Sequence, residues 1–151
     1  METFLVAILL MFAAQEKEPP KQKVEYGKRV YVGGAVEMEV LPYCTCTECC
    51  GDDPNSKAGK TATGKDAKKY VDGVIADPRL LPYGMRLFIP NVGERVVDDT
   101  GSRAKAAGDK GQYRIAFRVK THDEVLAIRK RIGGDSTKMT VILIEEVIEK
   151  K

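Results

Sequence analysis

The residues best suited to chemistry are carboxylates that end two short apolar runs in the middle of the chain. The run 74–76 ends in Asp77, and the run 95–97 ends in Asp98 and Asp99. A polar group at the end of a buried strand lies at the rim of a sheet or barrel, where a substrate can reach it. Clustered carboxylates can also supply a general acid, because burial and neighbouring negative charge raise a carboxyl pKa.

The motifs that contain these carboxylates also have an ordinary structural interpretation. Asp-Pro and Asp-Thr-Gly are also common turn sequences, because Asp side chains accept hydrogen bonds from nearby backbone. Their occurrence together, at matching strand ends, favours a site over turn chemistry alone. The loop 60–64 adds small hydroxyl residues beside a glycine, which let backbone and hydroxyls approach a ligand closely, although its composition also fits a solvated turn.

All four cysteines fall in one short segment, as Cys44, Cys46, Cys49 and Cys50. In an oxidising compartment we expect disulfides that brace the following loop, with a pairing that sequence does not choose. A four-thiolate metal site is the alternative, but the spacing is cramped for zinc, which usually takes ligands from two separate knuckles. We therefore expect no cofactor. The only histidine, His122, is interpreted as a solvated helix start.

The length of 151 residues indicates one domain behind a short leader. Residues 1–14 contain an apolar run that is too short to span a bilayer and suits a signal peptide or short anchor, with a buried N-terminal helix as the alternative. Residues 15–23 form a polar linker, and 24–151 the folded domain. The expected location is secreted or in the cell envelope, with membrane contact only through an uncleaved leader.

The net charge of +3 is mild and is compatible with an anionic cell-wall polymer as partner. The sequence contains no basic stripe interleaved with aromatic residues, so a nucleic-acid partner is not expected.

Short apolar runs separated by turn residues predict a mainly β domain with one short helix. A capping box begins that helix at 121, a glycine pair ends it at 133, and 102–111 and 145–151 are expected to be a loop and a charged tail. The expected strands are 24–32 and 36–41, joined by a turn at 33–34, then 74–76, 85–89, 95–97, 112–120 and 139–144, the last buried on both faces.

Three ordered motifs, at 61–64, 73–84 and 96–101, resemble the 3D domain, which is named for three aspartates. This domain is shared by a family of peptidoglycan lytic transglycosylases and by stationary-phase survival and resuscitation-type cell-wall proteins. The segments 43–51 and 113–122 resemble a subgroup of these. The likeness covers roughly 38–146, and it implies a six-stranded double-psi β-barrel.

The resemblance implies cleavage of the β-1,4 bond between N-acetylmuramic acid and N-acetylglucosamine without water. A carboxylic acid protonates the leaving oxygen, and the muramyl 6-hydroxyl closes onto C1 to give a 1,6-anhydro end. The implied partner is the peptidoglycan glycan strand, and a monomer is expected.

The resemblance places the first two family aspartates at Asp77 and Asp99. The third, which is the best candidate for the catalytic acid, is replaced here by Ala116. The chain is therefore expected to be a lytic transglycosylase with weak or no turnover, or a non-catalytic peptidoglycan-binding module; a small metal- or redox-active protein built on the cysteines is a third hypothesis. The expected substrate-binding residues are Thr61, Thr63, Gly64, Asp98, Thr100 and Gly101.

Overall fold

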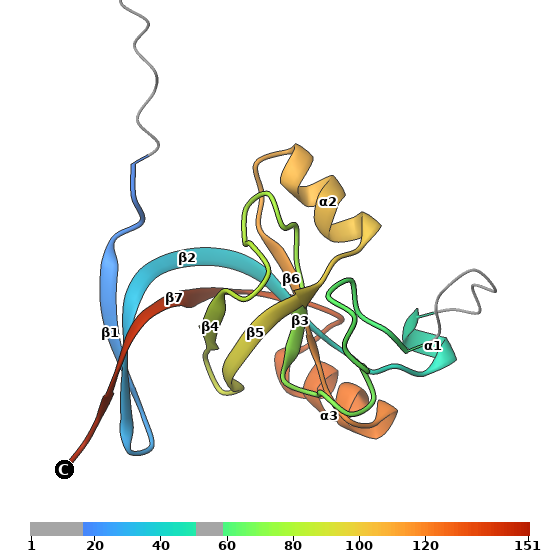
Figure 1. Ribbon diagram of the computed structural model, residues 1–151. Helices are drawn as coiled ribbons and strands as arrows, with labels where there is room; N and C mark the ends of the chain where they lie inside the picture. The colour runs from blue at the N-terminus through green and yellow to red at the C-terminus, as the bar shows by residue number, and fades with distance from the viewer. Residues whose placement is uncertain (1–16, 51–58) are drawn as a thin grey trace, which may run out of the picture.

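The computed structural model describes residues 17–50 and 59–151. The expected leader, the first two linker residues and residues 51–58 of the loop after the cysteines lie outside the described residues. The described chain is mainly β, as predicted, with seven strands in one sheet and three short helices rather than one (Figure 1). Within these ranges, no helix combines the length and apolar character that crossing a membrane requires.

The strands are β1 (Lys21–Tyr26), β2 (Arg29–Tyr43), β3 (Gly73–Ile75), β4 (Arg86–Ile89), β5 (Gly93–Asp99), β6 (Arg114–Arg118) and β7 (Thr137–Glu149). The helices are α1 (Thr47–Cys50), α2 (Ser102–Asp109) and α3 (His122–Ile132). The strand order in the sheet is β1-β2-β6-β3-β5-β4-β7, and β2 also pairs with β7. Pairing therefore runs from β2 through β6, β3, β5, β4 and β7 back to β2, and β1 lies outside this circuit.

The main core fills the inner side of the circuit with alternate residues of successive strands. It includes Met38, Val40, Val74, Val97, Ile115, Phe117 and Val141. A second cluster lies on the other face of β7, where Ile142 packs with Phe88 and Tyr31. Because Val141 and Ile142 are adjacent and both buried, the centre of β7 is buried on both faces, as predicted for 139–144.

The predicted turn at 33–34 is wrong. The chain turns at Gly27 instead, and β2 continues through Gly33, where its register with β7 shifts. A Cβ atom on Gly33 would lie 1.7 Å from the Leu143 carbonyl oxygen, so this glycine serves a close approach of two backbones. Strand pairing also reaches Lys21 and Glu149, so the linker and the charged tail are partly strand.

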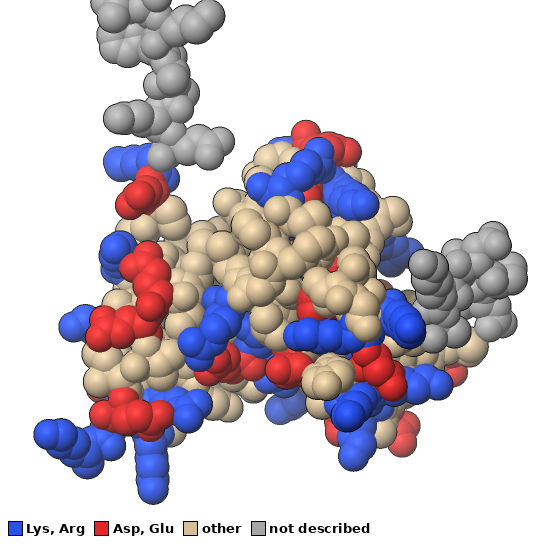
Figure 2. Space-filling view, in the orientation of Figure 1, with Lys and Arg blue, Asp and Glu red and all other residues tan. Residues whose placement is uncertain are grey.

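Figure 1 shows β1, β2 and β7 arching away from the rest as a three-stranded ribbon. Cationic and anionic side chains are intermixed on the face shown in Figure 2. Exposed ion pairs cross this ribbon between Lys21 and Glu145 and between Lys150 and Glu25.

Local sequence signals predicted helix α3 correctly but did not predict helix α2. The Thr121 hydroxyl accepts the Glu124 N–H at 3.2 Å, and Gly133 ends α3 in the left-handed region, as predicted. The loop predicted at 102–111 is wrong, because its first eight residues form α2. Three alanines give this segment high helix propensity, which its glycines and lysines obscured.

Gly33→Ala should destabilise the protein by about 1–3 kcal/mol or more, because the added methyl group collides with the backbone of β7. Gly134→Ala is the matched control, since the nearest atom to its Cβ would be 3.9 Å away and its φ is not positive. Denaturant unfolding of both variants measures the difference. Equal stabilities would contradict the close approach of β2 and β7.

Candidate functional site

Two of the three positions at which the sequence resemblance predicts aspartates, 99 and 116, lie along one row of the sheet. Asp99 of β5 pairs with Ile75 of β3, which pairs with Ala116 of β6. Because neighbouring strands are about 4.8 Å apart, the backbones at Asp99 and Ala116 are about 10 Å apart across Ile75. Asp77 follows Ile75 by two residues. An acid at position 116 would therefore lie two strands from Asp99 along this row, although Ala116 is in the middle of β6 and Asp99 is at the end of β5.

Asp77 is held as an anion by an arginine. Its side chain is 4% exposed, and Arg79 Nη2 lies 2.7 Å from its Oδ2. The hydrogen bonds from Arg79 lower the pKa of Asp77 from its usual value, even though burial opposes this change. The same guanidinium contacts Asp109 of α2 at 2.7 Å. Asp77 is therefore ionised at neutral pH and cannot donate a proton.

Helix α2 packs directly on Asp77. A Cβ atom on Gly108 would lie 1.8 Å from Asp77 Oδ2, so only glycine fits at this position of the helix. At the other end of α2, Gly101 is the N-cap residue, and its carbonyl accepts the Lys105 N–H at 3.0 Å. Gly101 thus joins β5 to α2.

Asp99 anchors the polar loop 61–64. Its Oδ1 accepts the N–H groups of Ala62 at 2.9 Å and of Thr100 at 2.8 Å. The Thr63 hydroxyl donates to the Asp98 carbonyl at 3.0 Å, and Thr61 Oγ1 accepts the Lys65 N–H at 3.1 Å. The loop is therefore an ordered turn against the end of β5, and both threonine hydroxyls help to build it.

Gly64 and Thr100 are also expected to bind the ligand. Gly64 adopts a left-handed conformation, with φ of 86°, which closes the turn of the loop. Thr100 Oγ1 is buried and has no hydrogen-bond partner among the described residues.

Asp98 belongs to a buried ion pair and not to an open rim. Arg118 Nη2 lies 2.9 Å from its Oδ1, and Nη1 lies 3.0 Å from Oδ2. Arg118 is 0% and Asp98 1% exposed, and Arg118 Nε donates to the Tyr43 hydroxyl at 2.8 Å. Burial alone would lower the pKa of Arg118, but its bonds to Asp98 and Tyr43 raise it, so the pair is charged.

Sequence reasoning missed Arg118. The available signal was an arginine inside an otherwise apolar strand, which requires an anionic partner wherever that strand is buried.

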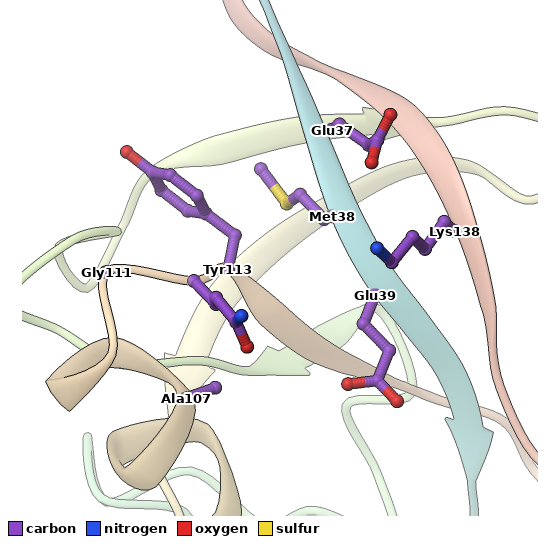
Figure 3. A pocket seen from close by; sticks show the side chains of 8 residues that line it. Glu37, Met38, Glu39, Ala107, Gly111, Tyr113 and Lys138 are labelled. Carbon is purple, nitrogen blue, oxygen red and sulfur yellow. The ribbon is translucent and has the colours of Figure 1, made fainter.

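Two cavities lie away from the aspartates. One, of about 240 Å³, is lined on one side by Glu37, Glu39 and Lys138 and on the other by Ala107 and Gly111 (Figure 3). The second, of about 560 Å³, has a more apolar lining that includes Phe117, Ile128 and Met139. Neither of these two cavities is lined by Asp77 or Asp99.

The predicted disulfides are wrong, because all four cysteines are free. Cys44 directly follows β2, and Cys49 lies in α1, so three sulfur atoms converge instead of pairing. The Cys44 sulfur lies 3.1 Å from that of Cys46 and 3.7 Å from that of Cys49. Cys50 points elsewhere, and its thiol donates to the Cys44 carbonyl at 3.3 Å.

His122 completes this group, so the prediction of a solvated helix start is wrong. Its Nδ1 lies 3.8 Å from the sulfur of Cys44, 3.3 Å from that of Cys46 and 3.5 Å from that of Cys49. The other ring nitrogen, Nε2, lies 2.9 Å from a carboxylate oxygen of Glu48. Burial raises the pKa of Cys44 to about 12, and a hydrogen bond from Cys44 lowers the pKa of Cys46 to about 7.

Asp98→Asn should destabilise the protein by about 3–5 kcal/mol, because it leaves the Arg118 guanidinium buried without its counter-charge. Glu145→Gln is the control, since it breaks the exposed pair with Lys21 and should change stability little. Denaturant unfolding compares the two variants. Similar effects would contradict the buried pair.

Arg79→Gln should raise the pKa of Asp77 towards its ordinary value of 3.8, because the lowering depends chiefly on the guanidinium. In the unmodified protein the folded-state pKa lies below the unfolded one. The stabilisation is therefore complete above pH 3.8 and is lost as the pH falls through the folded-state pKa. Carbon NMR titration of the Asp77 carboxyl measures the change, and Arg103→Gln, on the same helix as Asp109, should leave it unaltered.

No protein-family model matches this chain, and no curated protein matches it.

Proposed function

We propose that this chain is a peptidoglycan-binding domain of the lytic transglycosylase type, with weak or no turnover. The observation that carries the proposal is the row Asp99–Ile75–Ala116, which has a carboxylate at one end and a methyl group at the other. The proposed setting is the cell envelope, and the proposed ligand is the glycan strand.

The strand pairing supports the fold that the sequence resemblance implies. The circuit of β2, β6, β3, β5, β4 and β7 contains six strands, the number that the resemblance implies, and it combines parallel pairs (β2 with β6, β3 with β5) with antiparallel ones. We take this arrangement as a double-psi barrel. Its strand ends would present Asp99 and the loop 61–64 to a ligand, whereas Asp77 is buried beneath α2.

Weak turnover follows from the state of each carboxylate. Cleavage to a 1,6-anhydro end needs a group that donates a proton to the leaving oxygen. Asp77 is ionised beside Arg79, and Asp98 is buried against Arg118. Asp109 is paired with the same Arg79, and a methyl group at position 116 cannot act as an acid, so Asp99 is the remaining candidate.

Asp99 suits the binding of a sugar. Its Oδ1 is occupied by the two backbone N–H donors, and no described residue hydrogen-bonds to its Oδ2. That oxygen can accept a sugar hydroxyl. The same atom is the observation in favour of the second candidate function, an active transglycosylase that uses Asp99 as its acid.

Ala116→Asp should increase the release of anhydro-muropeptides from purified sacculi by about 10²–10⁴-fold, because it restores a general acid. Affinity should change little, since the acid acts mainly in the transition state. Mass spectrometry measures the products, and co-sedimentation with sacculi measures binding.

Ala116→Asn is the matched control, since it adds a side chain of similar size without a proton to donate. Asp99→Asn should weaken co-sedimentation. If the unmodified protein released anhydro-muropeptides robustly and Asp99→Asn abolished the release, Asp99 alone would carry the chemistry. If the unmodified protein did not sediment with sacculi, the glycan-binding proposal would be wrong.

A further inference from the structure

We propose that Cys44, Cys46, Cys49 and His122 bind one structural zinc ion. Their three sulfur atoms and the ring nitrogen of His122 all lie within 4.8 Å of one another. The set is built from two separate parts of the chain, the segment that leaves β2 and the first residue of α3. This inference concerns a different set of residues from the glycan site and does not depend on it.

The distances fit a tetrahedral site. With Zn–S of about 2.3 Å and Zn–N of about 2.0–2.1 Å, two ligand sulfurs lie about 3.8 Å apart, and a sulfur and a nitrogen about 3.6 Å apart. Cys44 and Cys49 have sulfurs 3.7 Å apart, and the His122 Nδ1 distances are 3.3, 3.5 and 3.8 Å. The Cys44–Cys46 separation of 3.1 Å has to widen slightly around an ion.

Glu48 orients the histidine for this role. It lies in α1, beside Cys49, and its carboxylate is 2.9 Å from His122 Nε2. An acceptor on Nε2 places the ring proton there, which leaves the Nδ1 lone pair directed at the three sulfurs. Carboxylate–histidine contacts of this kind are a regular feature of metal sites and increase the basicity of the ligand nitrogen.

The donor set selects the ion and its role. Three thiolates and one imidazole in a tetrahedral arrangement are typical of zinc. All four positions are filled by protein, so a substrate or water has no open coordination position. Such closed sites stabilise the fold instead of performing catalysis.

The ion would fasten the ends of two parallel strands. Cys44 directly follows β2, and His122 comes four residues after the end of β6, its parallel neighbour. One hydrogen bond already joins these ends, from the Val119 N–H to the Tyr43 carbonyl at 2.8 Å. Zinc would add a cross-link between residues far apart in sequence, at the same end of the sheet as Arg118.

The test uses the full chain, purified under reducing conditions without a chelator or a metal-affinity step. Elemental analysis of zinc-loaded, dialysed protein should give about one zinc per chain. Replacement by Co²⁺ should give the visible bands of a tetrahedral ion and a near-ultraviolet thiolate band. Cys50→Ser, the matched control, should leave both unchanged, whereas Cys44→Ser, Cys46→Ser and Cys49→Ser should each lose zinc or reduce the thiolate band by about a third.

Two further variants separate ligation from a merely structural role. His122→Cys should retain zinc and increase the thiolate band, because four cysteines also form a tetrahedral site, whereas His122→Ala should lose tight binding. Glu48→Gln should weaken zinc affinity by about 10–100-fold through the histidine. Chelation should lower the unfolding temperature of the unmodified protein more than that of Cys44→Ser, since the bound ion stabilises only the folded state and Cys44→Ser binds it less tightly or not at all.

The proposal is overturned if the reduced, unmodified protein binds no zinc and gives no tetrahedral cobalt spectrum, which requires no variant to fold. It is also overturned if Cys50→Ser lowers the zinc content or the thiolate band as much as Cys44→Ser does. Failure to sediment with sacculi would leave this result unaffected, so the two proposals fail separately.

Discussion

The buried ion pair between Asp98 and Arg118 is the interaction on which both candidate sites depend. It joins β5 to β6 across the intervening strand β3, where Gly73 offers no side chain in its way: a Cβ there would lie 2.2 Å from Asp98 Oδ2. Charge buried at this depth is stable only when every donor is matched, and Arg118 reaches both carboxylate oxygens and the Tyr43 hydroxyl. The residue after Asp98 is Asp99, and the residue after Tyr43 is Cys44. This ion pair therefore positions the strand end that carries Asp99 on one side and the start of the cysteine group on the other.

The two candidate sites make different demands on the same end of the sheet. Asp77 and Asp98 are held by ion pairs with arginines, and Asp99 is held through its Oδ1 by backbone N–H groups, while no described residue hydrogen-bonds to its Oδ2. The cysteine group directs its donor atoms inward to a common point and offers nothing to a substrate. The arrangement around Asp99 suits the proposed binding of a ligand, and the cysteine group suits the proposed stabilisation of the fold. A recognition surface formed by strand ends and a short loop gains from such reinforcement, because the loops themselves bury little apolar surface.

Sequence alone sufficed where the determining contacts are local. Helix α3 was predicted from Thr121 and Gly133, because these capping residues are adjacent in sequence to the helix that they begin and end. Alternation likewise indicated β6 and the core side of β2. Sequence-based prediction failed where a residue's role is set by a partner distant in sequence. His122 contacts Cys44, 78 residues away, and Arg118 contacts Asp98, 20 residues away. Gly33 is required because the backbone of Leu143 lies against it. Each residue also has an ordinary local interpretation, as a helix start, a strand cation or a turn glycine, and no local rule prefers the correct one.

The ribbon of β1, β2 and β7 has a consequence for self-association. Among the described strands β1 pairs only with β2, so the backbone groups along its outer edge are open to a strand from another molecule. Of the five exposed residues on that strand, Lys21, Gln22, Lys23 and Glu25 are polar, and Tyr26 is aromatic. A second copy of this strand that added in parallel and in register would place like charges opposite one another and remove water from them. The charges on β1 therefore disfavour in-register stacking of the ribbon seen in Figure 1.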